Sequence, residues 1–96
     1  MKISVVYFRN QQEVMSDVES YFVASRNPFY LGLIMKPSAG AWEILKSSSE
    51  TNIRVDGGEI LQFDIAYKIE VGENTIFFVK PAEGNEVPAE KLFLKS

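Results

Sequence analysis

The chain has 96 residues, of which 46% are apolar and 12% aromatic, and its formal net charge is −3. It contains neither cysteine nor histidine, which excludes disulfide bonds, thiolate and imidazole metal sites, and Ser-His-Asp or Cys-His catalysis. This length and apolar content predict one domain over residues 1–96 with a hydrophobic core of its own.

The charge pattern argues against nucleic acid as a partner. Lysine and arginine are scattered along the sequence, and most acidic residues lie in its second half, whereas phosphate-binding surfaces need clustered basic side chains. The apolar segment at residues 1–8 is too short for a signal peptide or a membrane span. We therefore expect a cytoplasmic protein with no membrane partner.

The first 26 residues predict a strand followed by a helix. Residues 2–8 are mostly β-branched or aromatic on both alternating faces, which is typical of a central strand buried on two sides. Val14, Val18 and Phe22 then recur at intervals of four residues, with mostly polar side chains between them. With Asn10 as a cap before the first turn, this spacing predicts an amphipathic helix over residues 11–26.

The middle of the chain predicts two hairpins. Residues 29–36 and 41–46 are mainly apolar segments that flank a Pro-Ser-Ala-Gly turn. Residues 53–55 and 61–71 flank an Asp-Gly-Gly turn, whose glycines supply the positive φ values that a tight hairpin needs. Alternation over residues 61–71 predicts one buried face and one solvated face.

Two further strands complete the prediction. Residues 75–79 are apolar on both faces, and residues 91–95 follow a polar loop as a short last strand. Together the elements indicate a β-rich α+β fold: a mostly antiparallel sandwich or partly closed barrel of about seven strands, with one amphipathic helix after the first strand. The second apolar face of several strands needs a cover, which a second sheet, a barrel interior or another molecule would provide.

Carboxylate side chains are the remaining candidates for chemistry. Asp56 lies in a turn, and Asp64 and Glu70 fall on the solvated face of a strand. The acidic loop around Glu83 and Glu86 lacks the spacing of an EF-hand calcium loop. Since these positions have structural explanations, the sequence predicts no catalytic residue, no metal site and no cofactor.

Four aromatic residues form the candidate interaction surface: Tyr30, Trp42, Phe77 and Phe78. Phe77 and Phe78 are adjacent in one strand and point to opposite sides, so at most one of them faces any single core. Aromatic side chains of this kind dominate many protein interfaces. With the catalytic groups missing, the pattern predicts a non-enzymatic protein-interaction module of the inhibitor, immunity or adaptor type, with a protein partner and a tendency to form homo-oligomers.

Two alternatives stay open at this point. Strands that are apolar on both faces also suit a self-associating structural subunit of a phage or secretion-type assembly. Trp42 or Tyr30 could instead serve as a stacking platform in a small-ligand or carbohydrate-binding β-domain. An enzyme would have to rely on Asp, Glu, Lys or Tyr alone.

Overall fold

The computed structural model describes residues 1–94 of the chain, which form seven strands and two short helices. The elements are β1 (Ile3–Arg9), β2 (Gln12–Asp17), β3 (Ser20–Arg26), β4 (Phe29–Met35), α1 (Trp42–Lys46), β5 (Glu50–Val55), β6 (Ile60–Val71), β7 (Asn74–Pro81) and α2 (Glu86–Phe93). The strands form one antiparallel sheet in the order β2-β1-β5-β6-β7-β4-β3. Among residues 1–94 no ladder joins the edge strands β2 and β3, so the sheet is not closed. The predicted β-rich α+β class with about seven antiparallel strands is confirmed.

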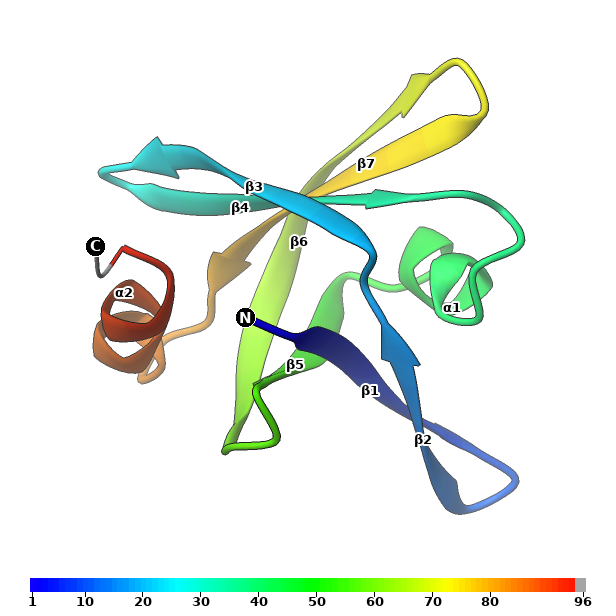
Figure 1. Ribbon diagram of the computed structural model, residues 1–96, viewed down its shortest axis with the longest axis horizontal. Helices are drawn as coiled ribbons and strands as arrows, with labels where there is room; N and C mark the ends of the chain where they lie inside the picture. Colours follow the sequence, from blue (N-terminus) through cyan, green and yellow to red (C-terminus); the bar gives the residue numbers. More distant parts are fainter. Residues whose placement is uncertain (95–96) are drawn as a thin grey trace.

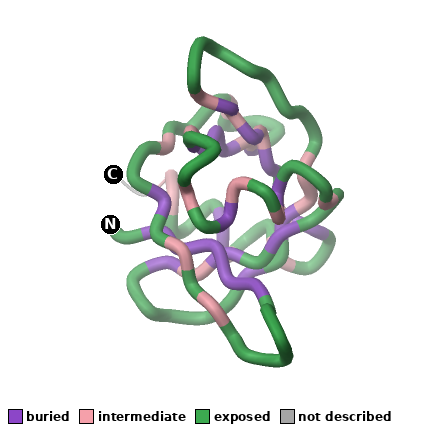
Figure 2. Tube along the Cα trace, turned by 90° about the vertical axis from the view of Figure 1, so that its right-hand side faces the viewer, coloured by how far each residue is buried: buried purple, intermediate pink, exposed green. Residues whose placement is uncertain are grey.

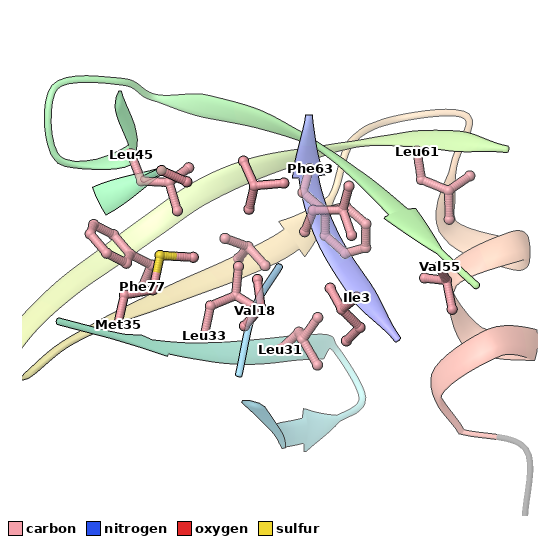
Figure 3. Close-up of a cluster of buried hydrophobic side chains, with 14 of the residues drawn as sticks. Ile3, Val18, Leu31, Leu33, Met35, Leu45, Val55, Leu61, Phe63 and Phe77 are labelled. Carbon is pink, nitrogen blue, oxygen red and sulfur yellow. The ribbon is translucent and has the colours of Figure 1, made fainter. Parts of the chain in front are cut away.

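The sheet curves around one hydrophobic core (Figure 1). Buried segments gather in the middle of the molecule, and the hairpin tips are exposed (Figure 2). The two helices pack at opposite ends of the core: Leu45 of α1 lies at one end, and Val55 and Leu61 lie at the end beside α2 (Figure 3). The largest fully buried side chains are Phe63, Phe77, Ile3, Leu31, Leu33, Leu45, Ile53, Val5 and Val79.

The predicted helix over residues 11–26 is wrong, because this segment forms β2 and β3. Asn10 and Gln11 have φ values of 53° and 66°, and β1 pairs with β2 directly across them. Positive φ at both residues is the signature of a two-residue type I′ hairpin turn, and asparagine tolerates this conformation well. Asn10 therefore begins a hairpin turn instead of capping a helix. The apolar residues with helical spacing are divided between β2, which contains Val14, the connection at Val18, and β3, which contains Phe22.

The predicted strand at residues 41–46 is also wrong, because Trp42–Lys46 forms helix α1. β4 pairs with β3 on one side and with β7 on the other, so neither edge of β4 is free to pair with the segment that follows it. The predicted last strand at residues 91–95 is wrong over its described part, because residues 86–93 form α2. Lys95 lies outside the described residues.

β6 departs from strict alternation midway along its length. Its pairing with β7 shifts register at Ala66, as a β-bulge does. Before the bulge, Leu61 and Phe63 point into the core and are 3% and 0% exposed. Beyond it, Tyr67 and Ile69 are 61% and 49% exposed, because one extra residue moves the following side chains to the opposite face. The predicted buried face of residues 61–71 therefore holds only for the first half of the strand.

Candidate functional site

The loop of residues 36–41 joins β4 to α1 and lies against β1 and β2. The Tyr7 hydroxyl donates a hydrogen bond to the Gly40 carbonyl oxygen at 3.3 Å. A Cβ atom added to Gly40 would lie 3.3 Å from both the Ser16 Oγ and the Tyr7 hydroxyl oxygen, which is tighter than an ordinary van der Waals contact. The absence of a side chain at Gly40 thus permits the close approach that fixes the loop.

Two hollows adjoin this loop, and we call them together the loop groove. The first has a volume of about 570 Å³ and lies between the loop and residues 16–20, where β2 leads into β3. The second has a volume of about 510 Å³ and lies between the loop and the β6–β7 hairpin. Lys36, Ser38 and Asn74 line both hollows, so the hollows meet at these residues. Each volume is typical of a small-ligand site.

The lining of the loop groove combines hydrogen-bonding groups with apolar side chains. Lys36 contributes an ammonium group and Asn74 a carboxamide. Ile34 and Ala39 form the apolar part of the first hollow, and Met35, which also borders it, is 5% exposed and packs in the core. Hydroxyl groups, which both donate and accept hydrogen bonds, come from Ser16, Ser20 and Ser38.

Two acidic residues, Asp17 and Glu19, also border the first hollow. Asp17 accepts a hydrogen bond from the Ser4 Oγ at 2.9 Å, and its other oxygen lies 3.6 Å from the Lys2 Nζ. The Lys2 and Asp17 side chains are 70% and 60% exposed, so solvent screens this ion pair. The Asp17 carboxylate thus contacts Ser4 and Lys2, which do not line the hollow, whereas Glu19 forms no ion pair among residues 1–94.

Polar contacts fix α1 against the β6–β7 hairpin and so build one wall of the second hollow. The Trp42 indole N–H donates to the Thr75 Oγ1 at 3.0 Å. The Lys46 Nζ lies 4.6 Å from the centroid of the same indole and 3.0 Å from a carboxylate oxygen of Glu70. The Lys68 Nζ donates to the Lys46 carbonyl oxygen at 2.6 Å, at the helix end where carbonyl groups lack partners within the helix.

The structure separates the four aromatic residues of the predicted interaction surface. Phe77 is fully buried in the core. Trp42 is half-buried and lines the second hollow. Tyr30 and Phe78 are half-buried on the other side of the sheet, because they alternate with core residues along β4 and β7. The sheet thus brings only Tyr30 and Phe78 to a common face.

We call this side of β3, β4, β6 and β7 the outer face. The Phe22 ring covers Gly32, where a Cβ atom would lie 2.5 Å from ring atoms. The same ring meets the Phe78 ring edge-on, with 6.0 Å between centroids. The Tyr30 and Tyr67 rings lie 6.3 Å apart. An aromatic cluster therefore lies on this face, and its role in binding a partner stays a prediction.

The residues of the loop groove belong to no motif that the sequence shows. Lys36, Ser38 and Asn74 come from two distant segments, and the turn signal around Ser38 carries no information about what lies opposite. A basic residue followed by Pro-Ser at the end of a buried strand is the one local hint. Within residues 1–94, no group of three His, Cys, Asp or Glu side chains is arranged to hold a metal ion. None of the described helices has the length and apolar character needed to cross a membrane.

No protein-family model and no curated protein sequence matches the chain, but solved structures share its fold. Component B of nitrilotriacetate monooxygenase from Mycobacterium thermoresistibile has a TM-score of 0.66 at 10% identity, over 84% of this chain and 65% of that one. An FMN-binding protein from Thermus thermophilus, with bound p-hydroxybenzaldehyde, has a TM-score of 0.67 at 9% identity, over 84% and 68%. The flavin reductase of styrene monooxygenase from Pseudomonas putida S12 has a TM-score of 0.64 at 12% identity, over 84% and 76%.

These likenesses show the fold of the chain, which spans 65% to 76% of the length of the three proteins. They contradict the prediction of a non-enzymatic protein-interaction module, because these three proteins of the same fold are named as a monooxygenase component, an FMN-binding protein and a flavin reductase. The error has a chemical cause. A missing set of catalytic side chains does not exclude an enzyme whose cofactor carries the chemistry.

Proposed function

We propose that the chain binds a flavin in the loop groove and acts as a small flavin-dependent oxidoreductase. The observation that carries this proposal is the loop groove itself, a space of ligand size lined by hydrogen-bonding groups. It occurs in a fold that the chain shares with flavin reductases and an FMN-binding protein. Fold likeness alone does not assign a function, so the fit of the lining to a flavin is the deciding point.

The chemistry of the lining fits the uncharged part of a flavin. The ring system offers carbonyl oxygens and ring nitrogens as hydrogen-bond acceptors. Lys36 and Asn74 can donate hydrogen bonds to these atoms. The ring system also has one imide N–H, for which the Glu19 carboxylate is an acceptor within the same hollow. Ile34 and Ala39 suit the apolar end of the ring, and the serine hydroxyls can pair with the hydroxyls of the ribityl chain.

The residues of this chain would hold and orient the ring. When bound, a flavin supplies a ring that exchanges a hydride or single electrons with a substrate. The hydrogen bond from Trp42 to Thr75 keeps the wall of the second hollow in place. The hydrogen bond from Tyr7 to Gly40 does the same for the loop. Fixed donors of this kind reduce the entropy that binding and orientation cost.

Riboflavin is expected to bind the protein saturably, with one ligand per chain. Its fluorescence should fall on binding, and the Tm of the protein should rise, because a ligand that binds only the folded state stabilises that state. A fluorescence titration and a thermal melt measure the two effects, with adenosine at equal concentration as a control that lacks the flavin ring. No response of either signal up to the solubility limit of riboflavin would contradict the proposal.

Self-association stays a prediction. Tyr67 and Ile69 on the outer face are 61% and 49% exposed, and a second copy would remove this apolar surface from water. Light scattering over a wide concentration range is expected to show a dimer or a larger species, and I69K is expected to shift the mass towards the monomer. A strict monomer at every concentration would contradict the prediction. The cytoplasmic location also stays a prediction, which cell fractionation tests.

A further inference from the structure

We infer that the loop groove selects riboflavin over FMN and FAD, the flavins that carry phosphate. The inference rests on the proposed function and names the form of flavin that the site accepts. A terminal phosphate monoester carries about 1.5 to 2 negative charges near neutral pH. Sites for such groups supply basic side chains or arrays of backbone N–H donors. The lining of the loop groove has the opposite balance of charge.

Acidic residues border the first hollow together with the serine residues whose hydroxyl groups a phosphate would need. Asp17 ends β2 and Glu19 follows in the bend before β3, and both residues border the hollow. Lys2 partly compensates Asp17 at 3.6 Å. No basic side chain among the described residues forms an ion pair with Glu19.

Acidic residues border the second hollow as well. Glu70 and Glu73 line it, and Lys46 forms an ion pair with Glu70 at 3.0 Å. Among residues 1–94, Lys36 is the one basic residue that lines either hollow, against four acidic residues, of which Asp17 and Glu70 are paired with Lys2 and Lys46. A phosphate placed beside Lys36 would therefore stay within reach of like charges in both hollows.

Riboflavin avoids this repulsion because its ribityl chain ends in a neutral hydroxyl group. A hydroxyl group can donate a hydrogen bond to a carboxylate and accept one from Lys36 or a serine. The lining that repels a phosphate can therefore bind the ribityl hydroxyl group. Because like charges repel near a solvated protein surface, we expect FMN to bind about tenfold more weakly than riboflavin at low ionic strength.

Parallel fluorescence titrations with riboflavin, FMN and FAD test the inference. The expected result is a dissociation constant for FMN about tenfold above that of riboflavin, with a ratio that falls as salt is added because salt screens repulsion. Equal affinities, or tighter binding of FMN, would overturn the inference and leave the proposed function standing. If none of the three flavins binds, the proposed function itself fails.

A pair of charge variants assigns the selectivity to the first hollow. The double variant D17N/E19Q keeps both side chains similar in shape and removes two negative charges, so the ratio of the FMN and riboflavin dissociation constants should fall towards one. E59Q/E83Q removes two charges that lie outside the loop groove, and its ratio should remain near the original value. Thermal melts confirm that each variant is folded. An equal change of the ratio in both variants would mean that net charge decides the preference, and would overturn the assignment to this hollow.

Discussion

Replacing Phe77 by alanine is expected to lower the free energy of unfolding by about 3–5 kcal/mol. Phe77 is 0% exposed, and it lies on the core face of β7, where truncation leaves a cavity that the surrounding sheet cannot close fully. A domain of this size has a total stability of roughly 5–15 kcal/mol, so the variant should lose a large share of it. Urea unfolding measures the effect as a fall in the midpoint at constant slope.

Phe78 provides the matched control, because it is the neighbouring residue with the same side chain. It is half-buried on the outer face, where its truncation opens no enclosed cavity, so F78A should cost only about 1 kcal/mol. Equal losses for the two variants would contradict the assignment of the two faces of β7. They would mean instead that the outer face is as fully covered as the core.

S38W is expected to raise the dissociation constant for riboflavin by at least about tenfold, a loss of about 1.4 kcal/mol in binding free energy. Ser38 lines both hollows of the loop groove and is exposed, so an indole at this position would occupy space that a ligand needs. The fold should tolerate the change, because substitutions at exposed positions usually alter stability by less than about 0.5 kcal/mol.

S49W controls for the general effect of an added tryptophan. Ser49 is also exposed, but it lines a separate hollow between β1 and the segment that follows α1. S49W should bind riboflavin as the unmodified protein does, and thermal melts should show both variants folded. Unchanged riboflavin affinity in S38W would place the ligand elsewhere on the protein.

The fold class can be predicted from the sequence because it depends on patterns that extend over several residues, such as apolar strand segments and turn sequences. The apolar pattern of residues 2–8 and 75–79 correctly indicates strands with buried side chains, and Asp56-Gly57-Gly58 correctly indicates a hairpin turn. Positive φ at Asp56 and Gly57 explains the success, because the residues in this turn favour that conformation.

The errors arise where a local pattern has two interpretations and tertiary pairing decides between them. Val14, Val18 and Phe22 satisfy helical spacing, yet Asn10 forms a hairpin turn that commits the segment to strand pairing with β1. The bulge at Ala66 is another example, since nothing in an alternating sequence marks the residue where register shifts. Interactions between strands far apart in the sequence determine both outcomes.

The candidate site lies beyond what local patterns predict. Ser16, Lys36 and Asn74 belong to three segments that meet only after the sheet has formed. None of them belongs to a catalytic motif, because the proposed chemistry would reside in a bound cofactor and would require only donors and shape from the protein. Such a site leaves no motif of reactive side chains in the sequence.

The most direct test of flavin binding in the loop groove is NMR mapping of backbone amide shifts in ¹⁵N-labelled protein during a riboflavin titration. Binding in the groove predicts that the largest shifts fall in residues 16–20, in residues 36–41 and at Asn74 and Thr75, the segments that line the two hollows. Amides of α2, at the opposite end of the core, should stay unchanged. Shifts centred on α2 or on the outer face, or no shifts at all, would contradict the central claim.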